Sequence, residues 1–215
     1  MARSLAGKMD SVFVLKLVCS FIAGTLAFTL HEYAHALAAY TLGDPTAKYE
    51  GRLTPNPLVH LDPIGSLVML ATMMYSGIVI GWAKPVPVNE ANLKAGYFDR
   101  ALVALAGPMI NFVLAFIAGL LCHLNPGSGP VEMFLVCLIR ANLGFGLFNL
   151  FPCPPLDGWK ILTGFTPRDL GHKMYRLEHK CGMYALLVLL LLSPILVNPI
   201  LGPIFGFLMP LLTGP

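Results

Sequence analysis

Residues 11–43 read SVFVLKLVCSFIAGTLAFTLHEYAHALAAYTLG, an apolar run with few charged side chains. A helix needs about 20 apolar residues to cross the hydrocarbon core of a bilayer, so this stretch is long enough to span a membrane. The whole chain has the same character, because 56% of its 215 residues are hydrophobic and only 12% are charged. Soluble domains carry about twice that charged fraction. We therefore expect an all-α polytopic membrane protein.

Four further hydrophobic windows follow the first, and they cover residues 64–82, 101–123, 131–150 and 182–213. The last window contains four prolines, so we expect it to break into one spanning helix and a shorter, bent or interfacial piece. The connections at residues 44–63 and 83–100 are rich in Pro, Gly and Asn and are expected to be irregular or short-stranded. Within the first connection, residues 49–54 are a candidate edge strand for an extended peptide.

His31, Glu32 and His35 form an HExxH motif near the end of the first window. Positions i and i+4 of a helix share one face, so both imidazoles can coordinate one metal ion while the glutamate lies beside it. Catalytic zinc keeps one position open for a water molecule, whose proton a nearby carboxylate accepts. The alternative is two core histidines and a glutamate paired with neighbours. Ionisable groups are costly in hydrocarbon, so the motif favours a metal site.

A second constellation, NLFPCPPLDG at residues 149–158, follows the fourth window. Its prolines and glycine break the helix, and irregular backbone persists at membrane depth only where it is buried in protein or lines a wet cavity. A zinc ion with two His ligands needs a third protein ligand, and Asp157 is the best-placed carboxylate. The alternative is an Asp-Gly turn that caps the following helix.

Three motifs together resemble the site-2 protease family, whose members are zinc metalloproteases that cleave substrates within the membrane. They are the HExxH in an early helix, the NxxPxxxxDG of residues 149–158, and Ala106-Gly107-Pro108 with Asn111 at the start of a later helix. The resemblance implies that one zinc ion per chain is held by His31, His35 and Asp157. It further implies that Glu32 is the general base and that Asn149 positions the scissile peptide or its oxyanion.

The segments GRLTPNP (51–57) and GWAKPVPVN (81–89) are similar to those of compact, mostly prokaryotic members of this family. Unlike many relatives, the sequence shows no PDZ or cystathionine-synthase-type regulatory domain. We therefore expect a single transmembrane metalloprotease domain over residues 1–215. Its catalytic core is expected at about residues 11–165, and its C-terminal helices at 182–213.

Two other polar residues are candidates for supporting the site. Asn111 lies one turn into the third hydrophobic window, where its amide can hydrogen-bond across helices, and the alternative role is helix packing alone. His60 lies in the sequence HLDP and could approach the metal as an outer partner, whereas the alternative is a loop cap.

The metal site constrains the topology. His31 and His35 lie late in the first helix and Asp157 follows the fourth window, so these two helices must run in the same direction to share one ion. The 64–82 window then cannot be a single crossing. We expect it to be re-entrant or a tight hairpin.

The charge distribution suggests an orientation. The basic connections 83–100 and 159–181 are expected on the cytoplasmic side, together with the active site. This orientation places Arg3 and Lys8 on the outer face, which departs modestly from the positive-inside rule.

The expected function is hydrolysis of transmembrane protein substrates by an intramembrane zinc metallo-endopeptidase. The expected setting is the lipid bilayer of a prokaryotic cell membrane, crossed several times by the chain. No Lys/Arg run resembles a nucleic-acid patch, so no nucleic-acid partner is expected. The alternative is a non-proteolytic zinc-binding membrane protein or transporter, which needs further intramembrane ionisable residues to carry ions.

Overall fold

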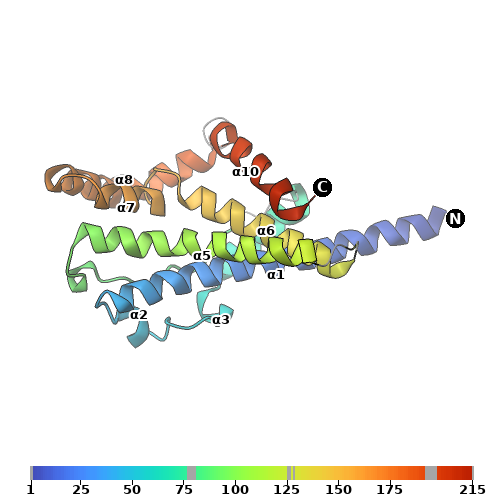
Figure 1. Cartoon of the computed structure of the whole chain (residues 1–215), viewed down its shortest axis with the longest axis horizontal. Coiled ribbons are helices and arrows are strands. Elements are labelled where there is room, and N and C mark those ends of the chain that lie inside the picture. The colour runs from blue at the N-terminus through green and yellow to red at the C-terminus, as the bar shows by residue number, and fades with distance from the viewer. Residues whose placement is uncertain (1, 77–80, 125–126, 128, 192–197, 215) are drawn as a thin grey trace.

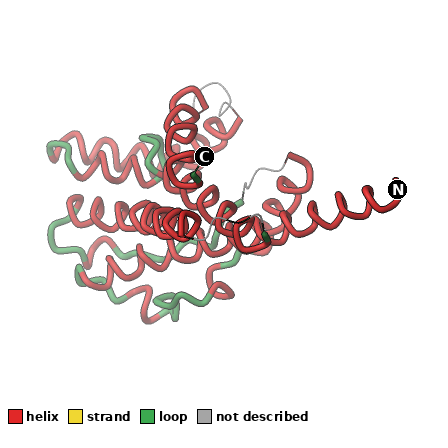
Figure 2. The backbone as a smooth tube through the Cα atoms, turned by 45° about the vertical axis from the view of Figure 1, so that its right-hand side comes forward, coloured by secondary structure: helices red, strands yellow, loops and turns green. Residues whose placement is uncertain are grey.

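The computed structural model describes residues 2–76, 81–124, 127, 129–191 and 198–214. This part of the chain is built from helices and loops, as Figure 2 shows, and contains no strand. The helices are α1 (Ala2–Thr41), α2 (Thr46–Tyr49), α3 (Pro57–His60), α4 (Pro63–Ser76), the 3-10 helix η1 (Glu90–Asn92), α5 (Tyr97–Leu124), α6 (Pro130–Asn149), α7 (Asp157–Gly164), α8 (Arg168–Leu191) and α10 (Asn198–Thr213). The expected all-α class is confirmed.

Three helices within the described residues are long and apolar enough to cross a membrane: the Ser11–Thr41 part of α1, α5 and α6. In Figure 1, α1 and α6 run in the same direction and α5 runs in the opposite direction. Small residues let these helices approach closely, for example Ala23 and Ala27 of α1 against Cys137 and Ala141 of α6. The parallel course of α1 and α6 is the one that the shared metal site requires.

The segment around α4 starts and ends at the same place in the fold. Leu61 and Ala83 form an isolated antiparallel bridge, and the Lys84 amide donates to the His60 carbonyl at 2.8 Å. At about 1.5 Å per residue, the 14 residues of α4 are too short to cross a hydrocarbon core of about 30 Å. The described parts thus begin and end together, as either a re-entrant element or a tight hairpin requires. The course through the membrane stays a prediction, and residues 77–80 lie outside the described residues.

The proposed edge strand at residues 49–54 is wrong. Tyr49 ends α2, and the chain then turns through Gly51 at φ +67°, a left-handed conformation that glycine adopts readily. The Arg52 amide bonds back to the Ala47 carbonyl at 2.7 Å. The amides of residues 49–52 all donate to carbonyls of residues 45–48, so they are not available to pair with another strand.

The last hydrophobic window is divided between α8 and α10, and the predicted break falls at residues 192–197, outside the described residues. Within the described residues neither piece meets the length and composition of a membrane span, so the predicted spanning helix is not found there. Helix α10 packs on the core of α5 and α6, with Phe205, Leu208 and Leu212 against Ala115 and Ile139.

Candidate metal centre

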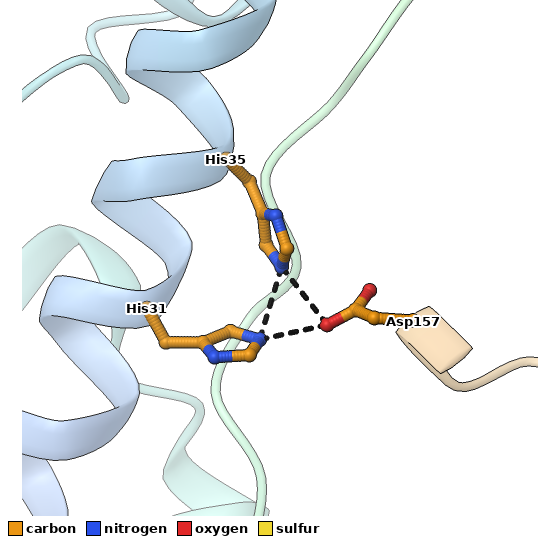
Figure 3. Close-up of side chains that lie close together, drawn as sticks. All are labelled: His31, His35 and Asp157. Atoms are coloured by element: carbon orange, nitrogen blue, oxygen red, sulfur yellow. Dashed lines mark hydrogen bonds and ion pairs between the residues drawn. The ribbon is translucent and has the colours of Figure 1, made fainter. Parts of the chain in front are cut away.

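Helix α1 presents His31 and His35 on one face, one turn apart, as Figure 3 shows. Their Nε2 atoms lie 2.9 Å from each other. The His31 side chain is 2% exposed and the His35 side chain 12%, so most of this face of the helix is shielded from solvent. An i, i+4 pair of imidazoles in an apolar helix therefore converges on one buried point.

Asp157 reaches the same point from the first residue of α7. Its Oδ2 atom lies 3.1 Å from His31 Nε2 and 3.2 Å from His35 Nε2. The next residue has to be glycine, because a Cβ at Gly158 would lie 2.1 Å from the Leu150 carbonyl oxygen. The broken segment after α6 thus folds back tightly and delivers its carboxylate to α1.

The tautomer of His31 follows from a chain of amide contacts. Asn142 Nδ2 donates to the Leu138 carbonyl at 2.9 Å, so Asn142 Oδ1 accepts from Asn111 Nδ2 at 2.8 Å. Asn111 Nδ2 also donates to the Ala27 carbonyl, which leaves Asn111 Oδ1 as the acceptor 2.7 Å from His31 Nδ1. The proton of His31 is therefore on Nδ1, and its Nε2 lone pair faces the cluster.

His35 is oriented in the same sense by the main chain of α5. Its Nδ1 lies 2.7 Å from the Val103 carbonyl oxygen, which can only accept, so Nδ1 carries the proton. Both Nε2 lone pairs consequently point at Asp157 Oδ2. That oxygen is buried and receives no hydrogen bond among the described residues.

This donor set fits a zinc ion. Two neutral imidazole nitrogens and one carboxylate oxygen are the three protein ligands of many catalytic zinc sites. Histidine ligands of zinc also donate their second ring N–H to an acceptor, as both imidazoles do here. Donor atoms around tetrahedral zinc lie about 3.3 Å apart, and the three separations here are 2.9, 3.1 and 3.2 Å. Within the described residues, this cluster is the one group of three His, Cys, Asp or Glu side chains that could hold a metal ion.

Gly107 of α5 forms the wall behind the cluster. A Cβ on this residue would lie 2.5 Å from His35 Nε2 and 2.7 Å from His31 Cε1. The backbone of α5 therefore contacts both rings. This contact explains why the central residue of the Ala106-Gly107-Pro108 motif is glycine.

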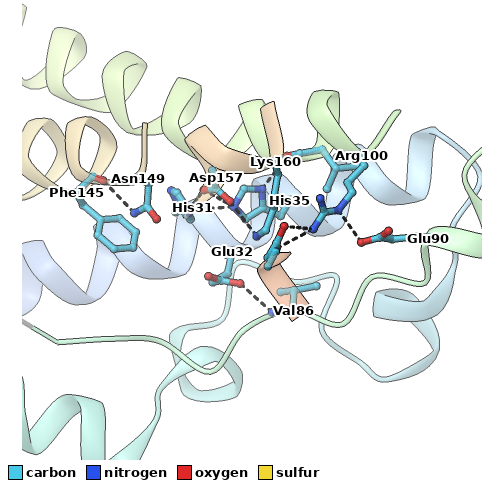
Figure 4. Close-up of polar contacts among 12 residues, drawn as sticks. His31, Glu32, His35, Val86, Glu90, Arg100, Phe145, Asn149, Asp157 and Lys160 are labelled. Carbon is cyan, nitrogen blue, oxygen red and sulfur yellow. Dashed lines mark hydrogen bonds and ion pairs between the residues drawn. The ribbon is translucent and has the colours of Figure 1, made fainter. Parts of the chain in front are cut away.

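Glu32 lies beside the cluster but belongs to a different environment. Its Oε2 accepts a hydrogen bond from the Val86 amide at 2.8 Å, as Figure 4 shows. The carboxylate is only half-buried. A carboxylate in this position can exchange a proton with a reacting water without itself being a ligand.

The remaining predicted residues lie in different surroundings. Asn149, at the end of α6, is 8% exposed, and its Nδ2 donates to the Phe145 carbonyl at 3.0 Å. His60 is 1% exposed, and its Nε2 lies 2.8 Å from the Thr54 carbonyl oxygen. His60 therefore braces the loop before α3, in agreement with the loop-cap alternative, and it does not share in the three-residue cluster.

Sequence reasoning missed three partners of the site. Asn142 is a polar residue inside an apolar window, and that placement was the available signal. Lys160 follows Asp157 at the i+3 spacing of a helix, and its Nζ donates to Asp157 Oδ1 at 3.2 Å. The Val86 amide could not be found from side-chain chemistry, because it is a main-chain group.

Comparisons with known proteins show which family and which proteins the chain is similar to. Residues 127–193 match the family model described as Peptidase family M50. YwhC of Bacillus subtilis (strain 168), provisionally named a zinc metalloprotease, is 40% identical over 76% of this chain and 76% of its own. MJ0611 of Methanocaldococcus jannaschii, provisionally named in the same way, is 31% identical over 69% of this chain and 71% of its own.

Zinc metalloprotease MJ0392 of the same archaeon is 25% identical over 84% of this chain and 44% of its own. No solved structure matches the chain. The chain belongs to Peptidase family M50 and is a zinc metalloprotease, as the resemblance to the site-2 protease family predicted. Three helices in the described part of the chain are long and apolar enough to cross a membrane, and the chain is a multi-pass membrane protein.

Proposed function

We propose that this M50 metalloprotease hydrolyses peptide bonds of transmembrane protein substrates within or close to the lipid bilayer. The observation that carries the proposal is the burial of the three-residue cluster among helices apolar enough to cross a membrane. His31 and His35 lie inside the apolar span Ser11–Thr41, and Asp157 follows the span of α6. The peptide bonds that can reach this cluster are those at membrane depth.

His31, His35 and Asp157 are the proposed ligands of one zinc ion per chain. When bound, zinc polarises a peptide carbonyl and acidifies a water molecule. Glu32 accepts the proton of the attacking water and later returns it to the leaving amine. A substrate helix must unwind locally beforehand, because its own hydrogen bonds and side chains shield its peptide bonds.

Asn149 and Asn111 are proposed to support this reaction in different ways. The Asn149 amide keeps one N–H beyond its bond to Phe145, and this N–H is available to a substrate carbonyl or to the oxyanion that forms from it. Asn111 acts through His31, whose ring it orients. His60 acts at most on the loop that it braces.

The test is proteolysis of a synthetic transmembrane peptide by the purified full-length chain. The wild type should bind about one zinc per chain and cleave the peptide. Glu32→Gln should bind the same zinc and lose about 100-fold or more in turnover, because an amide cannot accept the proton. Cleavage by Glu32→Gln at the wild-type rate would remove Glu32 as the base, and zinc binding without any cleavage by the wild type would favour a non-proteolytic protein.

We further propose that the active site faces the cytoplasm of a prokaryotic cell membrane. The basic connections on either side of the site support this orientation. Single cysteines at Asp62 and Lys84, in a background without the native cysteines, should both react with an impermeant thiol reagent from the cytoplasm. Labelling of the two positions from opposite sides would contradict both the orientation and the re-entrant course of residues 64–82.

A further inference from the structure

Residues 83–89, AKPVPVN, run beside α1 as an extended segment without helix or strand, and we refer to them as the strap. The strap is tied at its start, where the Lys84 amide donates to the His60 carbonyl and Arg52 Nη2 donates to the Lys84 carbonyl at 2.6 Å. Arg52 is itself 6% exposed. One end of the strap is therefore fixed by a buried guanidinium and a backbone pair.

The other end of the strap is tied to the loop that follows α1. The Asn89 amide donates to Asp44 Oδ2 at 2.7 Å, and Asp44 is fully buried. Val88 packs against the cluster that contains Ala39 of α1 and Val103 of α5. The strap is thus held at a constant place relative to α1, the helix that carries the metal site.

Between these two ends, the strap offers one main-chain donor to the site. Pro85 and Pro87 have no backbone N–H, so Val86 has the only amide proton in the Pro-Val-Pro sequence. This amide donates to Glu32 Oε2 at 2.8 Å. Within the described residues it is the single hydrogen-bond donor to Glu32, and Oε1 stays available to a water molecule.

We infer that the Val86 amide is a positioning group for the Glu32 carboxylate. A glutamate side chain has three rotatable bonds, and a donor fixed from outside the helix restricts them to one orientation. The flanking prolines lock their own φ angles, so the donor is in place before substrate binds. The inference rests on the proposed role of Glu32 as the general base, and it assigns the orientation of that base to the strap.

The test compares Val86→Pro with Val86→Ala in the full-length chain. Proline removes the amide proton and suits an extended Pro-rich segment, whereas alanine trims the side chain and keeps the proton. We expect equal zinc content in both variants, because the ligands are untouched. We expect kcat of Val86→Pro to be about tenfold or more below that of Val86→Ala, with KM values within about threefold of each other, because general base catalysis contributes about 100-fold or more.

Equal kcat values for two zinc-loaded variants would overturn the inference. Glu32→Gln, measured in parallel, separates this outcome from failure of the proposed function: an inactive Glu32→Gln beside an unaffected Val86→Pro removes only the role of the strap.

Arg52→Met provides a second measurement if Val86→Pro does not fold. It removes one of the two ties at the start of the strap without touching the Val86 amide, and we expect a fall in kcat at unchanged zinc content. A rise in kcat/KM would instead identify the strap as an obstruction over the site and overturn its positioning role.

Discussion

His31 and Glu32 are neighbours in the sequence, yet their side chains are held by two different parts of the molecule. The His31 ring is buried and is fixed through Asn111 and Asn142, which come from the spanning helices α5 and α6. The Glu32 carboxylate is half-buried and is held by one amide from a connection. In the proposed mechanism, metal binding depends on helix packing, and proton transfer depends on the strap. The two functions should respond separately to substitution.

The largest effect should come from loss of a ligand. His31→Ala, His35→Ala or Asp157→Ala should each lose most of the zinc and all measurable cleavage, because a three-ligand site has no spare donor. Zinc per chain, measured by elemental analysis after dialysis, checks this. Glu32→Gln is the matched control on the strap side and should keep its zinc. Wild-type zinc affinity in Asp157→Ala would take Asp157 out of the ligand set.

A smaller effect on zinc binding should come from Asn111, the residue that hydrogen-bonds to the ligand His31. Asn111→Ala removes the acceptor that sets the His31 tautomer, and we expect zinc affinity to fall by about 10- to 100-fold. Competition with a fluorescent chelator measures this affinity. Asn142→Ala, which touches Asn111 but not His31, should weaken binding less. If Asn111→Ala binds zinc as tightly as the wild type, zinc binding does not depend on the hydrogen bond between Asn111 and His31.

The smallest effect should appear on the strap side, as a dependence on pH. Burial acts to raise the pKa of Asp44, but hydrogen bonds from Thr46, Asn92 and Asn89 outweigh it and hold this pKa below the ordinary value. A carboxyl of this kind stabilises the fold above its unfolded pKa of about 3.9, and the contribution is lost as the pH falls through the folded value.

The wild type should therefore lose more thermal stability than Asp44→Asn when the pH is lowered from about 5 to about 3. Melting curves in detergent at both pH values measure the difference. Equal losses in the two proteins would show that Asp44 does not fasten the strap through its charge.

The residues around His31 could be predicted from the sequence more completely than the contact that holds Glu32. HExxH and Asp157 could be proposed as a set because His, Glu and Asp in apolar surroundings are rare and their spacing has a geometric meaning. Asn111 carried a similar signal, and the structure brings its side chain to His31. The roles of these residues stay predictions, whereas the fold class and the family are confirmed.

There is a physical reason why the contact between the strap and Glu32 could not be predicted. The segment GWAKPVPVN (81–89) could be singled out by its resemblance to relatives, but its contact with Glu32 could not. That contact is made by a main-chain amide and is held by main-chain carbonyls and the distant Arg52 and Asp44. The same limitation produced the wrong strand at residues 49–54. Extended and helical courses of a short Pro- and Gly-rich connection differ mainly in where backbone hydrogen bonds go, and composition does not determine that.

The missing side chain of Gly107 has a consequence for how closely two helices can approach. The α5 backbone is in contact with both imidazoles, and even one methyl group there would overlap them. The two imidazoles therefore have no room to withdraw toward α5. The hydrogen atom that stands in place of a side chain at Gly107 thus lets α5 approach α1 this closely at the level of His31 and His35.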